Sequence, residues 1–173
     1  MRLHQTLKLS IETVLKIMIL KANMSCHKIC IQKNKANARE IQGHLEACDH
    51  LFNPALSSYV NIPEYATKLF SRSRTFEAWS HDVLIGLLAF YVDAEGKTVF
   101  ISNISIVPEM SSKGMGKSLM KSLLGFMKAD NLSVIELETF PSNEIALRFY
   151  TALGFHRVAE VNNKVALRME IRI

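Results

Sequence analysis

The distribution of apolar positions along the chain predicts a mixture of strands and helices. Alternating or continuous runs of β-branched and aromatic residues indicate strands, because strand side chains point to opposite faces with a period of two. Apolar residues three and four positions apart indicate helices instead. The predicted strands cover residues 27–32, 82–92, 98–107, 133–140, 156–161 and 164–173. The predicted helices cover residues 37–48, a stretch after Pro63 that runs through Leu69 toward Phe76, a stretch following Lys117, and 143–153.

The third predicted strand changes the face of its apolar side chains partway along. Val99 and Ile101 occupy odd positions, whereas Ile104 and Ile106 occupy even positions. A β-bulge near Ser102 would produce this change, because a bulge inserts one extra residue into a strand. A strand buried on both faces would carry the same residues without a bulge. The pattern leaves both interpretations open.

A segment of small residues follows that strand and leads into a helix. It reads S-S-K-G-M-G-K and covers residues 111–117. Backbone N–H groups at a helix N-terminus lack partners within the helix, and the helix dipole favours negative charge there. Glycine also lets a ligand approach the backbone closely. We interpret the segment as a phosphate cradle.

Part of this segment is also typical of a nucleotide-binding P-loop. Gly116, Lys117 and Ser118 match the end of G-x-x-x-x-G-K-[ST], but Ser111 stands where the first glycine belongs. Only about a third of the chain follows, which leaves little room for the crossovers of a parallel sheet. A P-loop protein is kept as an alternative.

Motifs farther along favour a different family. The strand ending I-S-I-V-P, the segment S-S-K-G-M-G-K and the later run N-E-I-A-L-R-F-Y-T-A-L-G-F together resemble the GNAT superfamily of N-acetyltransferases over residues 83–161. The resemblance implies an α/β (α+β) fold, with a mixed, mostly antiparallel central sheet, a splayed, bulged strand, and helices on both faces. It implies transfer of an acetyl group from acetyl-CoA, the cosubstrate, to a primary amine without a metal ion. The superfamily segment usually begins with Gln or Arg, and here it begins with Ser111.

The resemblance also implies roles for individual residues. Backbone groups of Ile104 to Ile106 would pair with the pantetheine arm, and Asn143 would contact the same arm. Tyr150 would protonate the departing thiolate. Many relatives carry a glutamate where this chain has Ser102 and Asn103. Either an ordered water relays the proton with Glu138 nearby as the candidate base, or the acceptor amine arrives already neutral. The expected coenzyme-binding residues are Ile104, Ser105, Ile106, Ser111, Ser112, Lys113, Gly114, Met115, Gly116, Lys117, Asn143 and Tyr150.

The acceptor is left open by the resemblance. A small-molecule amine and a protein N-terminus both fit, and a non-catalytic module that only binds the coenzyme is an alternative from another class. The two helices before residue 77 usually cap the acceptor side of such a domain. Candidate acceptor contacts on or beside them are His44, His50, Tyr59, Tyr65 and Trp79.

The composition limits the classes of binding partner and the cellular compartment that we expect. The net charge is +5, but the basic residues are scattered, which favours a solvated surface over nucleic-acid binding. Cys26, Cys30 and Cys48 lack the spacing of a metal site or a disulfide framework, which indicates a reducing cytoplasm.

The ends of the expected domain follow from the same sequence. The apolar run near the N-terminus is interrupted by Glu12 and Lys16, so it is neither a signal peptide nor a membrane anchor. We expect residues 1–23 to be a helical or disordered extension, with a homodimer as one outcome of its pairing with another copy. We expect residues 24–173 to form a single domain with no membrane partner.

Overall fold

The computed structural model describes residues 29–172, and its centre is one seven-stranded sheet. The strand order is β1-β2-β3-β4-β5-β7-β6. The strands are β1 (Cys30–Lys33), β2 (Arg74–Ser80), β3 (Val83–Asp93), β4 (Thr98–Ile106), β5 (Val134–Thr139), β6 (His156–Val161) and β7 (Lys164–Glu170). Within this described sheet, β4 and β5 are parallel and the other neighbours are antiparallel. The predicted mixed, mostly antiparallel sheet is confirmed. The expected extension, residues 1–23, lies outside the described residues, so the domain boundary stays a prediction.

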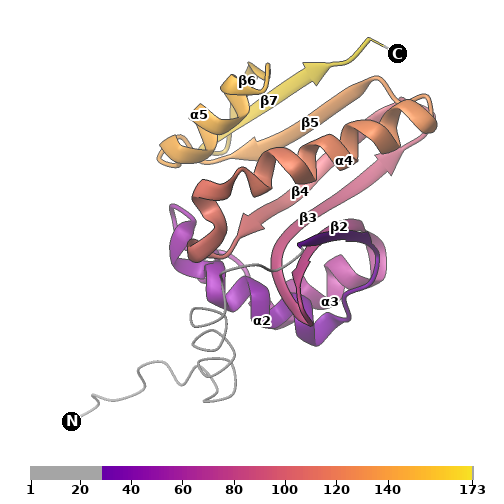
Figure 1. Cartoon of the computed structure of the whole chain (residues 1–173). Helices are drawn as coiled ribbons and strands as arrows, with labels where there is room; N and C mark the ends of the chain where they lie inside the picture. Colours follow the sequence, from indigo (N-terminus) through magenta and orange to yellow (C-terminus); the bar gives the residue numbers. More distant parts are fainter. Residues whose placement is uncertain (1–28, 173) are drawn as a thin grey trace.

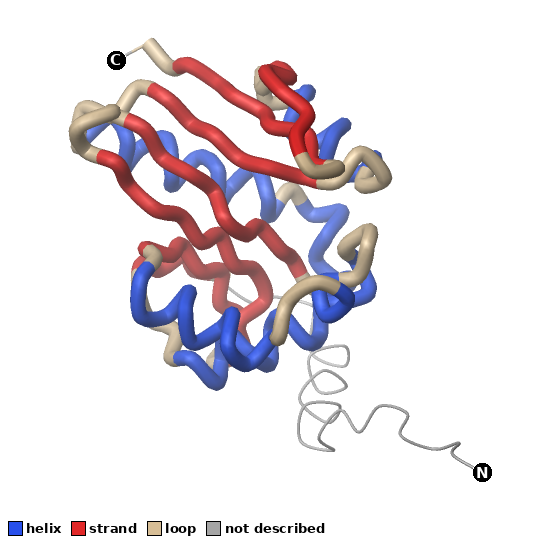
Figure 2. The backbone as a smooth tube through the Cα atoms, turned by 180° about the vertical axis from the view of Figure 1, so that it is seen from behind, coloured by secondary structure: helices blue, strands red, loops and turns tan. Residues whose placement is uncertain are grey.

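Helices cover the two faces of the sheet unequally. The elements are α2 (Ala38–Cys48), α3 (Ile62–Arg72), α4 (Met115–Ala129), α5 (Glu144–Ala152) and three short 3-10 helices, η1 (Asp49–Leu51), η2 (Leu56–Ser58) and η3 (Pro108–Lys113). The long helix α4 crosses one face, and α5 lies on that face beside β6 and β7 (Figure 1). On the opposite face, α2 and α3 cover only the half of the sheet around β2 and β3 (Figure 2). Within residues 29–172, no helix covers that face of β5, β7 and β6.

The strand β2 was missed by the sequence analysis, which extended the preceding helix toward Phe76. The helix α3 ends at Arg72, because Ser73 adopts an extended conformation. Every residue of β2 after Arg74 is buried, so the strand shows no alternation of apolar and polar positions. A buried Glu77 in its middle accepts hydrogen bonds from the backbone N–H groups of Lys35 and Ala36. A strand buried on both faces, with a polar centre, gives no periodic signal.

The strand β4 carries the bulge that the sequence suggested. Asn103 pairs with Ala89 of β3, and Ile101 pairs with the next residue, Phe90. Ser102 is therefore the extra residue, without a partner on β3. The bulge interpretation is confirmed.

The bulge changes which face of the sheet the later side chains reach. Ile104 and Ile106 pack against the same apolar cluster as Val99 and Ile101, beneath α4. Ser105 points to the other face, where its hydroxyl meets α2. The second half of β4 is thus apolar toward α4 and polar toward α2.

The strands β4 and β5 separate toward their carboxyl ends. Their pairing runs from Thr98 with Val134 to Ile101 with Leu137 and then stops. Both strands nevertheless continue, β4 to Ile106 and β5 beyond Leu137 to Thr139. The expected splayed strand is confirmed. We call this opening the β4–β5 parting.

A buried histidine attaches α2 to the sheet behind this parting. His44 is only 4% exposed, and its Nδ1 lies 3.2 Å from the carbonyl oxygen of Leu84. Its Nε2 lies 2.9 Å from the hydroxyl oxygen of Ser105. Burial lowers the pKa of His44 from 6.5 to about 4, so the ring is neutral at physiological pH. The expectation that His44 contacts the acceptor is wrong, because its side chain is enclosed between α2 and the sheet.

We expect His44 to make the protein less stable in mild acid. The unfolded chain takes up a proton near pH 6.5, whereas the folded chain takes it up only near pH 4. The contribution of the neutral His44 ring to the free energy of unfolding is therefore fully present above pH 6.5 and is lost as the pH falls toward 4. Between about pH 7 and pH 5 the free energy of unfolding should fall by about 2 kcal/mol through this group. Urea unfolding at several pH values measures the decline, and His44→Gln should lack this part of it. Equal slopes for the two proteins would contradict the assignment.

Candidate functional site

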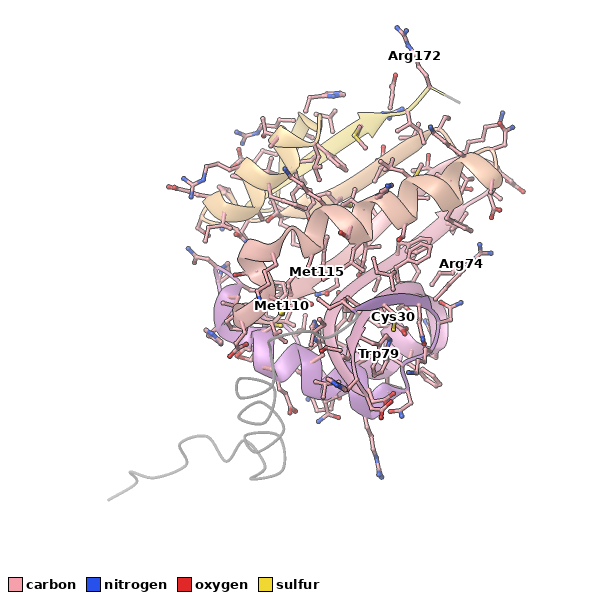
Figure 3. All side chains as sticks on the ribbon, in the orientation of Figure 1. Cys30, Arg74, Trp79, Met110, Met115 and Arg172 are labelled. Carbon is pink, nitrogen blue, oxygen red and sulfur yellow. The ribbon has the colours of Figure 1, made fainter. Side chains whose placement is uncertain are left out.

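The segment predicted as a cradle is more ordered than a loop. Residues 108–113 form η3, Gly114 is the N-cap of α4, and the helix begins at Met115. Met110 and Met115 are buried in the apolar core on either side of Ser111 to Gly114. Both are labelled in Figure 3, where they lie near the start of α4. The core thus fixes both ends of a short turn, and residues 115–117 of the predicted segment already belong to α4.

The start of α4 has the features of an anion site. Gly114 offers no side-chain cap, and the first turn carries no acidic residue. The first amide that bonds back into the helix is that of Ser118, which donates to the Gly114 carbonyl. The N–H groups of the three preceding residues therefore point out of the helix end. Lys113 and Lys117 are exposed and form no ion pair with another described residue.

The two glycines of this segment are required for different reasons. Gly114 has φ +72°, which a side chain would strain, and a Cβ there would meet no atom within 4 Å. A Cβ on Gly116 would lie 3.1 Å from Cζ of Phe149 in α5. Gly116 therefore lets α4 and α5 approach each other. The sequence suggested ligand approach for both glycines, and the structure adds close helix packing as a reason for Gly116.

Asn143 opens α5 at the carboxyl end of β5. Its side-chain oxygen accepts a hydrogen bond of 3.2 Å from the backbone N–H of Ala146, so Asn143 is the N-cap of α5. The amide nitrogen of the same side chain has no partner among the described residues. Asn143 can therefore cap the helix and still donate a hydrogen bond to a ligand.

Tyr150 lies about two turns farther along α5. It is 5% exposed and packs edge-on against the rings of Phe149 and Phe155. Burial raises the pKa of its phenol, so the hydroxyl is protonated at neutral pH. No described residue forms a hydrogen bond with that hydroxyl. The geometry leaves a proton donor without a protein acceptor.

Tyr59 and Tyr65, two of the candidate acceptor contacts, lie at the β4–β5 parting. The Tyr65 hydroxyl donates a hydrogen bond of 2.9 Å to the carbonyl oxygen of Ser102, the bulged residue. Burial raises the pKa of Tyr65 to about 12. The Tyr59 ring packs edge-on against Phe140, which follows β5, with centroids 5.0 Å apart. Each arm of the parting thus contacts a tyrosine.

The other predicted acceptor contacts lie elsewhere. Trp79 is buried in β2 and donates from its indole nitrogen to Glu77 (Figure 3). Because its side chain is enclosed in the apolar cluster beneath α2 and α3, Trp79 cannot contact an acceptor. His50 is exposed on η1.

A hydrogen-bonded bridge across the parting was not predicted. The Asn53 side chain donates to the carbonyl oxygen of Ser142 at 3.0 Å, and the Ser142 hydroxyl donates to the carbonyl oxygen of Asn53 at 3.1 Å. The two residues are 89 positions apart, so no local pattern indicates the pair. The bridge joins the loop between η1 and η2 to the turn that precedes Asn143.

Glu138 is the carboxylate one residue beyond the last pair of β4 and β5. Its side chain is half-exposed, and its Oε2 lies 3.2 Å from Nζ of Lys164. The same ammonium lies 5.9 Å from the centroid of Phe140. An exposed ion pair of this kind contributes little to stability and separates readily.

The described part of the chain contains neither a candidate metal site nor a candidate membrane-spanning helix. Residues 29–172 hold no group of three or more His, Cys, Asp or Glu side chains arranged to bind a metal ion. None of their helices is long and apolar enough to cross a membrane.

Known proteins resemble this chain in both sequence and fold. N-alpha-acetyltransferase 30 of Schizosaccharomyces pombe is 34% identical over 86 residues, which cover 48% of this chain and 57% of the relative. The match thus spans little more than half the length of that curated protein.

Two solved structures share the fold. The PaiA N-acetyltransferase of Thermoplasma acidophilum, solved in complex with coenzyme A, has a TM-score of 0.65 at 14% identity, covering 82% of this chain and 99% of that one. The ribosomal-protein-S18-alanine N-acetyltransferase of Escherichia coli has a TM-score of 0.64 at 17% identity, covering 84% and 96%.

A family model gives the assignment. The model described as the acetyltransferase (GNAT) family matches residues 45–155, which include α3, the bulged strand β4, the cradle, Asn143 and Tyr150. The family match and the parting of β4 from β5 both favour an acetyltransferase fold over a nucleotide-binding P-loop protein. The chain belongs to the GNAT acetyltransferase family.

Proposed function

We propose that this chain transfers an acetyl group from acetyl-CoA to a primary amine. The observation that carries the proposal is the β4–β5 parting, which lies next to the start of α4 in a chain of the GNAT family. A strand edge and a helix N-terminus are adjacent there, and both present backbone N–H groups. The family implies a cosubstrate with an amide-containing arm and phosphates, which these two features suit.

The residues present fit that cosubstrate. Backbone groups of Ile104 to Ile106 pair with the pantetheine arm along the free edge of β4, and one N–H polarises the thioester carbonyl. The cradle residues Ser111 to Lys117 hold the pyrophosphate, with Lys113 and Lys117 supplying positive charge. The free amide nitrogen of Asn143 donates to the arm from the other side of the parting. Acetyl-CoA itself supplies an acetyl group activated as a thioester.

The side chains at the parting divide the proton transfers between them. Glu138 accepts the proton of the incoming ammonium, directly or through water, after its exposed contact with Lys164 opens. The amine would then attack the polarised carbonyl carbon, and the C–S bond would break as the C–N bond forms. The extra proton on the new amide nitrogen would pass to solvent, from which Tyr150 is reprotonated after the step below. Tyr150 donates its proton to the departing thiolate, since a buried phenol without a hydrogen-bond acceptor holds its proton for that step.

The acceptor that we propose is the α-amine at the start of a polypeptide. Relatives named for N-terminal substrates, the yeast N-alpha-acetyltransferase and the S18-alanine enzyme, support this choice. So does the structure. The Tyr59 ring packs against Phe140, which directly follows β5, and Tyr65 contacts Ser102 of β4; we call these three rings the aromatic wall. No described helix covers the adjoining face of β5, β7 and β6 (Figure 2). A chain whose first residue enters at this wall can extend over that face.

We also propose that the protein works in the cytoplasm. The unpaired Cys30 and Cys48 support a reducing cytoplasm. A homodimer, and the absence of nucleic-acid and membrane partners, stay predictions from the sequence.

An amine panel tests the proposed reaction. Purified protein and acetyl-CoA should release thiol with short peptides that have a free N-terminus. The same peptides with a blocked N-terminus and an internal lysine should release none, because only the α-amine enters at the aromatic wall. Spermidine and glucosamine test small amines. Turnover of these alone would contradict the polypeptide acceptor. Binding of acetyl-CoA without turnover of any amine would favour the non-catalytic alternative.

The hydroxyl of Tyr150 provides a sharper test of the mechanism. Tyr150→Phe keeps the packing against Phe149 and Phe155 but removes the proton donor. We expect kcat to fall by ~10²-fold, as is common when a positioned general acid is lost, while the Kd of acetyl-CoA changes little. Steady-state thiol release and calorimetry measure the two quantities. Normal turnover in the folded variant would remove Tyr150 from the mechanism.

A further inference from the structure

The stretch of β4 beside the parting has lost one of its two neighbouring strands. Up to Ile101 it lies between β3 and β5, but residues 103–106 pair only with Gly86 to Ala89 of β3. The proposed coenzyme arm would bind along the edge that β5 has vacated. A strand held on one side is freer to move, so its position needs support that leaves this edge open.

The side chain of His44 gives such support from the face of the sheet. It reaches from α2 to both strands, with Nδ1 at the Leu84 carbonyl of β3 and Nε2 at the Ser105 hydroxyl of β4. The Ser105 hydroxyl also donates a hydrogen bond of 2.9 Å to Oδ1 of Asn103. All three side chains are buried on the α2 face. None of them needs the backbone edge that faces β5.

A backbone carbonyl faces each nitrogen of the neutral ring. The Leu84 carbonyl oxygen lies 3.2 Å from Nδ1, and the Ser105 carbonyl oxygen lies 3.3 Å from Nε2. A carbonyl can only accept, so the single ring proton serves β3 when it is on Nδ1 and β4 when it is on Nε2. With the proton on Nε2, the ring donates to Ser105 and the Ser105 hydroxyl donates to Asn103. The three side chains thus form one buried chain of contacts, which makes this part of β4 rigid.

We propose that His44 is a positioning residue that, through Ser105 and Asn103, holds residues 103–106 of β4 in the place where they bind acetyl-CoA. This inference rests on the proposed function. It assigns to a buried residue of α2 an effect on coenzyme affinity, although His44 touches neither the coenzyme nor the acceptor. A residue that served only to attach α2 would affect stability without affecting that affinity.

A second buried network supplies the matched control. On β2, the buried Thr75 hydroxyl donates to the buried carboxylate of Glu77, as the buried Ser105 hydroxyl donates to Oδ1 of Asn103. Thr75→Val and Ser105→Ala each delete one buried hydroxyl and leave one buried acceptor without its partner. The strand β2 does not border the parting. The two variants therefore separate general destabilisation from displacement of β4.

The experiment measures acetyl-CoA affinity by calorimetry and stability by urea unfolding on the same samples. We expect Ser105→Ala and His44→Ala each to weaken acetyl-CoA about ten-fold. The double variant should be no weaker than His44→Ala, because the two residues act through one chain. His44→Gln, whose amide can still reach Ser105, should recover part of the affinity. Thr75→Val should lose stability and keep normal affinity.

The outcomes distinguish this inference from the proposed function. If the wild-type protein does not bind acetyl-CoA, the proposed function fails and this inference fails with it. If the wild type binds and Ser105→Ala binds equally well, only the inference is overturned. Equal weakening by Thr75→Val would also overturn it. Should His44→Ala not fold, Ser105→Ala and His44→Gln still decide the question.

Discussion

The structure depends on one constraint, which is that β4 must leave β5 without leaving β3. Backbone N–H and C=O groups require partners, and a strand that parts from a neighbour exposes a row of them. The extra residue Ser102 makes this change possible, because a bulge bends and twists the strand locally while pairing with β3 continues on both sides of it. The exposed row lies inside the molecule's own opening instead of at its outer edge. A ligand with an amide-containing arm can complete it.

The elements that follow the bulge are placed by it. The chain leaves β4 at Ile106, turns through η3 and enters α4, so the start of α4 lies at the carboxyl end of β4. On the other arm, the chain leaves β5 and enters α5 at Asn143. The Asn53–Ser142 bridge and the Tyr59–Phe140 contact then join the η1–η2 region to this second arm. The residues that we propose for coenzyme binding and proton transfer thus lie on segments that the local chain path brings to one opening.

Much of this arrangement was predictable because it is local in sequence. The phase change between Ile101 and Ile104 made a bulge one of two interpretations, and the apolar spacing after Asn143 indicated the helix α5. Features made by distant contacts were not predictable. The strand β2 has no alternating pattern because both of its faces are buried, and Gly116 is explained only by Phe149 on another helix. The burial of His44 was not predictable either, because it depends on contacts with Leu84 and Ser105 that are distant in sequence.

The central claim is that the free edge of β4 binds acetyl-CoA, and hydrogen exchange tests it most directly. Amides that gain hydrogen-bond partners on binding exchange more slowly. The account predicts that acetyl-CoA slows exchange in peptides covering residues 102–107 and the first turn of α4, while exchange in β7 is unchanged. Binding of acetyl-CoA that leaves residues 102–107 unprotected, with protection elsewhere in the sheet, would contradict the account.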